Sequence, residues 1–424
     1  EEIDAMLSMT PSLIVKNASR MKDMALDPRA VGEALNVDSV LTGTVRQSGA
    51  QLRVTVKLVN TKTEENIWAS TFDKSESDIF SVQREIAQKV VEGLKLKLGE
   101  GQQGLIVNRQ TKDLEAYNLY INGRKMWKTR TREGMRDSIE KFELALSKDP
   151  KFALAYVGIA DAYNQLVMYG HSPPEVSFPK AKDELKKALA LNDSISEAHA
   201  SLGFISWVYD WNWDAAEKSL NKALSINPNY PDARRWLSHV HITMGNISSA
   251  LEEIDKGIKL EPNSGNMLSA KSQYLAHSGK IEAAIKTAQE AFSRNPSFIF
   301  SHQALAEAHL MAGNHDSALK SLEQGDELYP GEFQLTKAEI SATRGDYAEA
   351  KKILNNEIKK RGTDVISSTE IAWCFYLIEE DIKALDYLEL AVKEKDTRIV
   401  YLHANFDWKR ISSTERFKSI SKKL

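Results

Sequence analysis

Small and hydrophobic residues recur with a helical period along most of the chain, and prolines interrupt this pattern at a fixed interval. The same interval separates Pro228, Pro262, Pro296 and Pro330. A proline inside a helix costs about 3 kcal/mol, so each of these prolines marks a point between helices. The interval predicts a structural unit of about 34 residues that repeats along the chain.

Each unit divides into two helices. In the blocks 231–264, 265–298 and 299–332, glycine stands at position 15, alanine at position 20 and a small residue at position 27. Glycine tolerates the left-handed backbone that ends a helix, and small residues give the second helix a thin face for close packing. The pattern therefore predicts stacked helical hairpins. The residues are Gly245, Gly279 and Gly313, then Ala250, Ala284 and Ala318, then Gly257, Ala291 and Gly325.

Weaker copies of the unit flank the three central ones. Pro150 closes an earlier unit, and Asp193 takes the place of the proline in the next. After Pro330 come RGDYAEAKKIL and IAWCFYLIEEDIKALDYLELAVKEKD, which keep the pattern with looser spacing. We expect about eight hairpins between residues 113 and 396.

Before residue 100 the pattern changes. Residues 27–38, DPRAVGEALNVD, predict a short helix with Asp27 as its N-cap and Pro28 at its first position. Residues 39–60 alternate polar and β-branched side chains around a Ser-Gly turn, which predicts a β-hairpin, and residues 66–74 predict a third strand. Residues 78–98 predict a long amphipathic helix. The expected fold class is α+β, a small α/β domain followed by an all-α superhelical solenoid.

This period, with its pattern of glycine, alanine and proline, resembles the tetratricopeptide repeat, and the resemblance covers residues 113–396. Stacked repeats of this kind form a curved array whose first helices line a concave groove, a surface suited to binding another chain. In that family positions 2, 5, 9 and 12 or 13 of the first helix face the groove. The resemblance thus implies a partner-binding groove lined by Asp161, Asn164, Asp232, Arg235, His239, Gln273, His277, Gln303, Glu307, Lys337 and Arg344.

The first hundred residues look like the amino-terminal TolB-like domain that precedes tetratricopeptide repeats in many bacterial proteins. The resemblance rests on residues 35–87, on DLEAYNLYINGR at 113–124 and on VYLHANFDWKRISSTERFKSI at 400–420. That domain usually opens with a strand, whereas EEIDAML already predicts its first helix, so we expect the chain to begin inside the domain. We expect a TolB-like domain over 1–100, a linker over 101–112, repeats over 113–396 and a capping segment over 397–424. Relatives often carry an upstream nucleotide cyclase or winged-helix DNA-binding module.

Composition narrows the possible partners. The net charge is −3, so the chain has no overall field that would attract nucleic acid, and no direct nucleic-acid contact is expected. The basic end 409–424 is interpreted as a solvated helix or fraying tail. A membrane helix needs an apolar run of about 18 residues or more, and none occurs, so no membrane segment is expected in this sequence. A cytoplasmic location is expected, and the extracytoplasmic part of a membrane-anchored protein is the alternative.

The sequence offers little chemistry. GEGQQG at 99–104 matches a dinucleotide fingerprint, but it follows a helix and leads into a polar stretch, so we interpret it as a linker. His239 and His241 point in opposite directions on a helix and do not chelate one ion. The turn containing Trp207, Tyr209, Trp211 and Trp213 fits packing better than a ligand cage. We expect no enzyme activity, no cofactor and no metal site.

Two functions stay open. The first is a non-enzymatic scaffold, the regulatory or sensory part of a bacterial signalling protein, which binds a partner protein or peptide in the groove. The second is a small-molecule sensor whose ligand sits between the α/β unit and the first repeats and controls an upstream cyclase or DNA-binding domain. A third interpretation, that the polar groove face is merely a solvated helix surface, is also open, as is the oligomeric state.

Overall fold

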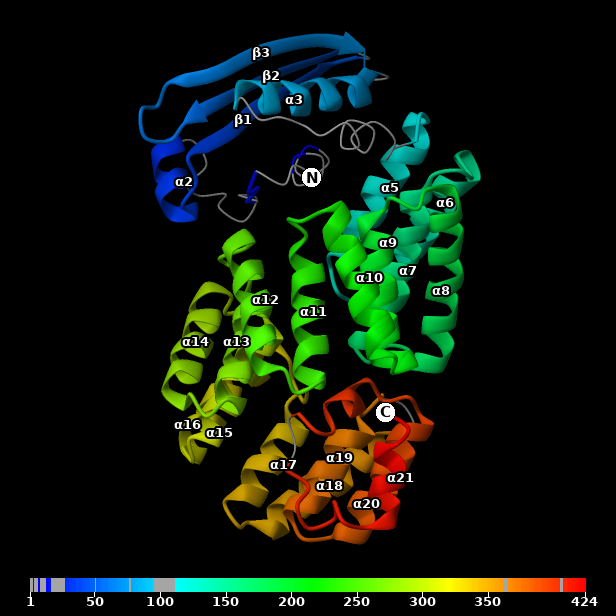
Figure 1. The fold of residues 1–424 in the computed structure, drawn as a ribbon, viewed down its shortest axis with the longest axis vertical. Coiled ribbons are helices and arrows are strands. Elements are labelled where there is room, and N and C mark those ends of the chain that lie inside the picture. Colours follow the sequence, from blue (N-terminus) through cyan, green and yellow to red (C-terminus); the bar gives the residue numbers. More distant parts are fainter. Residues whose placement is uncertain are drawn as a thin grey trace.

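The structure is a computed structural model that describes residues 3, 7, 13–16, 27–49, 51–75, 78–94, 111–361, 365–404 and 407–424. It consists of a three-stranded sheet with its covering helix, followed by a long array of paired helices that curves away from the sheet (Figure 1). The expected α+β class is confirmed.

The sheet forms as the alternating pattern predicts. Helix α2 (Pro28–Leu35) begins at Asp27, whose side chain accepts a hydrogen bond from the Arg29 amide, so the predicted N-cap is confirmed. Three antiparallel strands follow in the order β1–β2–β3, with β1 and β2 joined at the predicted Ser-Gly turn. The strands are β1 (Ser39–Ser48), β2 (Gln51–Asn60) and β3 (Asn66–Ser75).

Helix α3 (Ile79–Gly93) covers one face of the sheet. Alternate residues of β2 such as Val54 and Val56 are buried against Val82 and Ile86 of α3. The helix expected over 78–98 therefore forms, but it ends at Gly93, and residues 95–98 lie outside the described part of the chain. The GEGQQG segment also lies outside it, as does most of EEIDAML, of which Ile3 and Leu7 are described as helical.

Sixteen α-helices in residues 111–361 and 365–404 pair in chain order into antiparallel hairpins. The first helices of neighbouring hairpins contact one another at several places along the array, as α13 and α15 do. The pairs are α5 (Leu114–Trp127) and α6 (Arg132–Lys148), α7 (Ala153–Met168) and α8 (Pro174–Leu191), α9 (Ser196–Ile205) and α10 (Trp213–Ile226), α11 (Pro231–Thr243) and α12 (Ile247–Leu260), α13 (Gly265–His277) and α14 (Ile281–Arg294), α15 (Ile299–Met311) and α16 (His315–Leu328), α17 (Gln334–Thr343) and α18 (Tyr347–Lys360), α19 (Ser368–Leu377) and α20 (Asp381–Lys393).

The predicted breaks between and within the hairpins are confirmed. Each of the four evenly spaced prolines lies in the loop between one hairpin and the next. Gly245, Gly279 and Gly313 turn the chain within their hairpins with φ angles of 78°, 79° and 75°. These angles are in the left-handed region, where glycine carries no steric penalty. The hairpins therefore begin and end where the local sequence requires.

The thin faces of the second helices are packed tightly. Ala250, Ala284 and Ala318 are fully buried. A Cβ atom added to Gly325 would lie 2.5 Å from the ring of Phe333, which opens the next hairpin. No side chain fits at that distance without a shift of its neighbours. Small residues at these positions thus set the spacing between successive hairpins.

The end of the array returns to its middle. The 3-10 turn η4 (Thr397–Tyr401) follows α20 and packs against α11 and against the π-helical turn η3 (Ser206–Asp210) between α9 and α10. Ile399 is buried in the core of the last hairpins, whereas its neighbour Val400 is buried in the core of the first ones. In Figure 1 the orange and red helices accordingly lie below the lower ends of the green helices α9 and α10. Two adjacent residues thus join cores that are far apart in sequence.

The basic end of the chain forms a helix, one of the two expected states, but its apolar face is buried and it is not a fraying tail. Helix α21 (Glu415–Ser421) buries Phe417 and Ile420 against the last hairpin. Arg416 pairs with Asp386 and Glu389 of α20 at 2.7 and 2.8 Å. Two apolar side chains and an acidic neighbouring helix therefore hold this segment in place.

Cys374 is buried among the apolar side chains of the last hairpins, and burial raises the pKa of its thiol. Within the residues that the structure describes, no helix combines the length and the apolar character needed to cross a bilayer.

Candidate functional site

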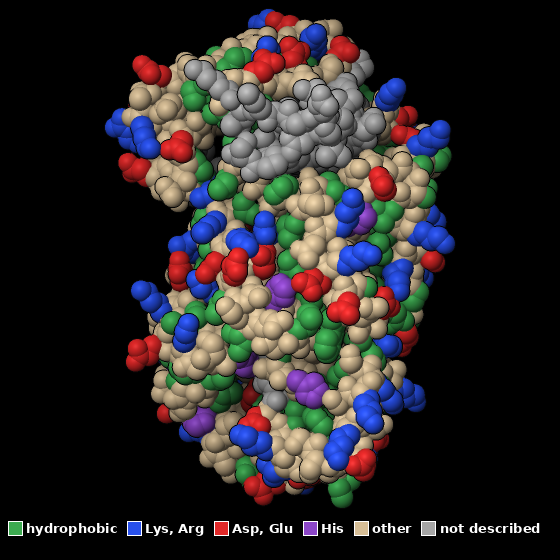
Figure 2. Space-filling view, viewed as in Figure 1, with side chains coloured by type: hydrophobic (Ala, Val, Ile, Leu, Met, Phe, Trp, Pro, Cys, Tyr) green, Lys and Arg blue, Asp and Glu red, His purple; other side chains and the backbone are tan. Residues whose placement is uncertain are grey.

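The inner face is the surface formed by the first helices of the hairpins, α5, α7, α9, α11, α13, α15, α17 and α19, and by η4. Neighbouring first helices are in contact along most of the array, so side chains on this face meet those of the next unit. Lys/Arg, Asp/Glu and His side chains are interspersed on the face of the molecule seen in Figure 2, without a large area of one sign.

The amino-terminal part of the inner face carries three of the predicted groove residues in ion pairs. Arg124 of α5 lies 3.3 Å from Asp161 of α7, which also accepts a hydrogen bond of 2.6 Å from Ser201 of α9. Burial raises the pKa of Asp161, while Arg124 and Ser201 act in the opposite direction. Arg235 bonds to Asp232 at 3.1 Å one turn earlier on α11. These residues form a polar strip across four helices.

Asn164 also lies in this part, but it is only 4% exposed and neither of its amide atoms has a hydrogen-bond partner. Its position on α7, one turn beyond Asp161, puts it on the inner side of the helix. An unsatisfied buried amide is uncommon, because such groups normally find a partner.

The middle of the inner face is covered by the chain itself. His239 of α11 lies with Nδ1 at 2.8 Å from the hydroxyl of Tyr274 and at 3.0 Å from that of Tyr401 in η4. The indole of Trp207 stacks on the imidazole with an interplanar angle of 10°. Burial lowers the pKa of His239 well below its usual value, so the ring is neutral and its Nδ1 can accept a hydrogen bond from a phenol. The carboxyl-terminal segment thus contacts His239, one of the predicted groove residues, directly.

The carboxyl-terminal part is rich in carboxylates. Glu307 of α15 accepts hydrogen bonds from Gln273 at 2.6 Å and from Gln303 at 2.9 Å, so the structure brings these three predicted residues together. Glu339 of α17 accepts a hydrogen bond from the indole of Trp373, and burial raises its pKa to about 7.

Arg398 of η4 enters this acidic part. Its Nε lies 3.4 Å from Glu370 of α19, and the charges of Glu307 and Asp396 also act on it. The Arg398 side chain is 38% exposed. The carboxyl-terminal part therefore remains reachable by solvent.

Three other predicted residues lie outside these clusters. Lys337 forms an ion pair with Asp326 of α16, and Arg344 forms one with Asp316 at the start of the same helix. Both therefore point toward a second helix. His277 is partly buried at the end of α13, and burial lowers its pKa.

The aromatic turn between α9 and α10 packs as expected, and it also holds a cation. Trp207 is buried, and its indole donates a hydrogen bond to Thr243. Lys395, which follows α20, places its ammonium 3.5 Å from the centroid of the Trp211 ring and donates to the Tyr209 carbonyl. The aromatic pair is therefore occupied by the chain's own lysine.

Sequence reasoning missed Arg130, Glu339, Glu370, Arg398 and Tyr401. One signal was present in the sequence, because arginine stands at position 130, in the hairpin turn where the central units have glycine. The structure gives this arginine a left-handed backbone with φ 59°. Arg398 and Tyr401 had no such signal, because their contacts depend on how the whole array curves.

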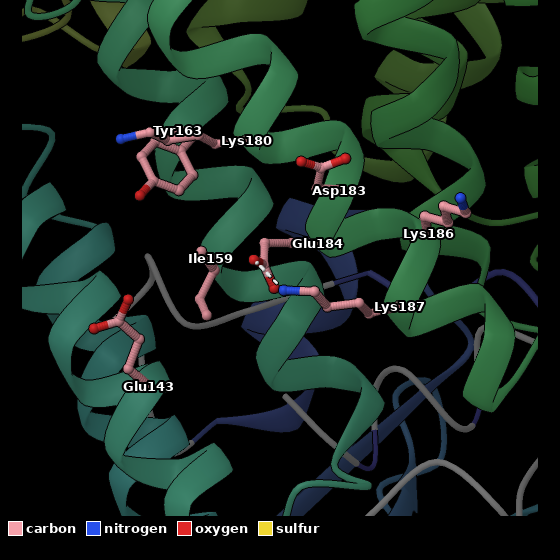
Figure 3. Close-up of a pocket in the computed structure, with 8 residues that line it drawn as sticks. All are labelled: Glu143, Ile159, Tyr163, Lys180, Asp183, Glu184, Lys186 and Lys187. Carbon is pink, nitrogen blue, oxygen red and sulfur yellow. Dashed lines mark hydrogen bonds and ion pairs between the residues drawn. The ribbon is translucent and has the colours of Figure 1, made fainter.

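The outer side of the array carries a shallow polar depression of about 340 Å³ between α6, α7 and α8 (Figure 3). Lys187 pairs there with Glu184 at 2.7 Å, and the ammonium of Lys180 lies 5.4 Å from the centroid of the Tyr163 ring. Acidic and basic side chains balance each other at this place. We take the inner face as the better candidate site. In the described residues no group of three His, Cys, Asp or Glu side chains is placed to hold a metal ion.

Comparison with known proteins supports the repeat. A family model described as Tetratricopeptide repeat matches residues 212–274, which span α10 to α13. The protein named "Putative adenylate cyclase 3" from Rhizobium meliloti (strain 1021) is 27% identical over 217 residues, which cover 49% of this chain and 36% of that protein. Tetratricopeptide repeat protein 33 from Xenopus laevis is 26% identical over 121 residues, covering 28% of this chain and 47% of that protein. The matched part of the chain spans less than half the length of these relatives.

Among solved structures, a human IFIT1 dimer with m7Gppp-AAAA is similar at a TM-score of 0.48 and 16% identity, over 74% of this chain and 77% of that one. The hairpins, their spacing and the family match lead to one conclusion: this chain contains tetratricopeptide repeats, built as a solenoid behind a small sheet domain.

Proposed function

We propose that this chain is a non-enzymatic interaction scaffold that binds a segment of a partner polypeptide along the inner face. The observation that carries the proposal is that adjacent first helices bring polar side chains together on the inner face. These are Arg124, Asp161 and Ser201 across α5, α7 and α9, and Gln273, Gln303 and Glu307 across α13 and α15. Amides, carboxylates and guanidinium groups in such a row pair with the N–H and C=O groups of an extended peptide.

The inner face offers such groups on either side of the region that η4 covers. The stretch from α5 to α11 has buried polar atoms without a partner, and the stretch from α13 to α19 has partly exposed carboxylates. A bound segment would therefore contact one stretch or run beside η4. We infer that the groove residues predicted from the repeat, Arg235 and Gln273 above all, contribute to its affinity.

The test is a peptide display screen against the whole chain, followed by calorimetric titration of the selected peptides. We expect Arg235→Glu and Gln273→Ala to weaken at least one class of peptide by about tenfold, the loss of one charge-assisted or neutral hydrogen bond plus its desolvation. Lys187→Gln, in the outer depression of Figure 3, is the matched control and should leave affinity unchanged. If both inner-face variants retain every selected peptide, the assignment is wrong.

We further propose that residues 1–100 are a TolB-like domain and that the whole chain is the regulatory part of a bacterial signalling protein in the cytoplasm. The order α2–β1–β2–β3–α3 followed by repeats supports this, as does the relative named as an adenylate cyclase, most of which lies outside the match. A cyclase or winged-helix module is the expected output, and both act on cytoplasmic substrates.

This regulatory role is tested in the natural protein that contains the chain. Its output, cyclase activity or DNA binding, is measured with and without a selected peptide, in the wild type and in Arg235→Glu. We expect the peptide to change the output of the wild type and to lose this effect in the variant. If a peptide that binds the chain leaves the cyclase activity or DNA binding unchanged, the regulatory role is refuted. The scaffold role is not affected by this result.

A further inference from the structure

Several buried polar atoms without a partner gather in the amino-terminal part of the inner face. In the part of the chain that the structure describes, these are Trp127 Nε1, Arg130 Nη1, Arg235 Nε and both amide atoms of Asn164. Buried polar groups are normally hydrogen-bonded, so each unpaired one requires an explanation. Four of these five atoms are donors. A group of unsatisfied donors fits an acceptor that comes from outside the chain.

The register of the first helices places two of these residues side by side. Arg124 of α5 contacts Asp161 of α7, and the two helices run in the same direction because each is the first of its hairpin. Three residues further along, one turn on in each helix, stand Trp127 and Asn164. They therefore occupy neighbouring positions on the inner face.

The same reasoning connects Asn164 to α11. Ser201 of α9 bonds to Asp161, so Phe204, one turn on, lies beside Asn164. The ring of Phe204 is 5.1 Å from that of Trp236, which adjoins Arg235. The register thus places Asn164 between Trp127 and the aromatic pair next to Arg235, whose guanidinium carbon lies 5.6 Å from the Trp236 ring.

Arg130 closes this group from the loop between α5 and α6. Its guanidinium carbon lies 3.9 Å from the centroid of the Trp127 ring, and that of Arg124 lies 4.3 Å from the same centroid. Asp232 attracts Arg130, whereas Arg124 and Arg235 repel it, and no ion pair of Arg130 occurs among the described residues. Positive charge therefore exceeds negative charge around Arg130.

The backbone of Arg130 adds a reason to look for a role. Its φ of 59° is left-handed, and the equivalent turns of the central hairpins have glycine, as at Gly245. A non-glycine residue in this region is strained. Glycine would suit this backbone better than arginine, so the guanidinium group of Arg130 is the feature to be explained.

We propose that this part of the inner face binds an oxyanion, the carboxylate or phosphate group of a partner polypeptide, between Trp127, Arg130, Asn164 and Arg235. The guanidinium groups supply forked donors that match two oxygens of such a group, and the indole and the amide supply further donors. A cationic ligand does not fit, because the Trp127 ring already has two guanidinium groups against it. The proposal deepens the scaffold function, on which it rests for the source of the anion.

The probes are small anions and do not require the partner. The whole chain is labelled with ¹⁵N at its eight tryptophan indoles, the Trp127 signal is assigned with Trp127→Phe, and inorganic phosphate, acetate or chloride is added at constant ionic strength. We expect the Trp127 signal to shift saturably with phosphate or acetate and not with chloride. The stronger of the two identifies the preferred oxyanion.

Arg130→Gly is the decisive variant, because glycine suits the left-handed backbone while the guanidinium is lost. We expect it to fold at least as well as the wild type and to bind the anion about tenfold more weakly. Asn164→Asp, which adds a negative charge, should abolish the response, and Lys187→Gln on the outer side should leave it intact.

A Trp127 signal that shifts no more than the other indoles, or an equal response in Arg130→Gly, would overturn the proposal. Either result leaves the scaffold function untouched if the selected peptides still bind. Conversely, a saturable anion response without any peptide ligand would refute the scaffold function alone.

Discussion

Lys395 and Trp211 meet across the closed array, with the ammonium 3.5 Å from the centroid of the indole ring. Both residues have left-handed backbone, with φ angles of 54° and 58°. Trp211 ends the π-helical turn within its hairpin, where the central hairpins have glycine, and Lys395 follows the last helix of the hairpin array, α20. Two strained turns that are far apart in sequence thus carry the side chains that join the end of the solenoid to its middle.

This contact should contribute measurably to stability. We expect Lys395→Met, which keeps most of the aliphatic stem, to lower the free energy of unfolding by about 0.5–2 kcal/mol, the range of cation–π interactions. Lys393→Met, on the exposed side of the same helix end, is the matched control. The measurement is urea unfolding at low protein concentration.

A double-mutant cycle isolates the pair. Lys395→Met should have little effect in a Trp211→Leu background, because the ring that receives the cation is gone. If the two changes add to within about 0.3 kcal/mol, the contact does not stabilise the closed array.

Spacing between hairpins gives a second prediction, from two glycines in equivalent positions. A Cβ on Gly325 meets the rigid ring of Phe333 at 2.5 Å, whereas a Cβ on Gly257 meets the flexible side-chain sulfur of Met267 at 2.9 Å. Alanine gains about 1 kcal/mol over glycine in a helix, and overpacking costs about 1–3 kcal/mol. We expect Gly325→Ala to destabilise the protein and Gly257→Ala to be near neutral, as measured by thermal and urea unfolding. Equal effects at both sites would show that the ring of Phe333 moves as readily as the methionine.

His239 predicts a loss of stability in acid. Burial lowers its pKa well below 6.5, and the charges of Arg235 and Arg398 act in the same direction. The unfolded chain therefore binds a proton below pH 6.5 that the folded chain does not, so stability falls as pH falls. We expect the fall between pH 7 and pH 5 to be smaller in His239→Gln by about 1–2 kcal/mol.

The comparison uses the difference between variant and wild type, because His171, His277, His309 and His403 also have lowered pKa values from burial. His315→Gln, at the start of α16, is the control and should not change the fall in stability between pH 7 and pH 5. If stability falls equally between pH 7 and pH 5 in the wild type and in His239→Gln, the imidazole of His239 is not held neutral by burial.

Glu339 predicts the opposite trend. Burial raises its pKa from 4.5 to about 7, with the hydrogen bond from Trp373 opposing and the charges of Glu307 and Glu370 adding to the rise. The folded chain therefore holds a proton between pH 4.5 and 7 that the unfolded chain has lost. Its contribution to stability is complete below pH 4.5 and is lost as pH rises through 7.

Replacing the carboxylate tests whether Glu339 lowers stability as pH rises. We expect Glu339→Gln to be more stable than the wild type at pH 8 by about 1–3 kcal/mol, and the difference to shrink toward pH 5. The glutamine oxygen still accepts the bond from the Trp373 indole. Glu282→Gln, which removes an exposed carboxylate at the start of α14, should show no such pH dependence. A Glu339→Gln variant that is less stable at pH 8 would mean that the ionised form is bound favourably.

Much of the fold could be predicted because its signals are local. The prolines between hairpins, the left-handed glycines within them and the capped helix at Asp27 each act through residues a few positions away. The residues that line the groove were predicted less precisely. The repeat puts Gln273, Gln303 and Glu307 on one face, and the structure brings them into contact, but the same rule also selects Asn164, which is buried, and Arg344, which pairs with the outer helix α16.

Local sequence specifies the hairpins, since proline, glycine and small side chains restrict the backbone and the helix spacing wherever they occur. Tertiary structure alone decided that Tyr401 meets His239, that Arg398 enters the acidic part and that Lys395 reaches Trp211. The physical reason is that each hairpin rotates slightly against the previous one, and only the sum of these rotations over the array sets where its end returns. No single unit contains that sum.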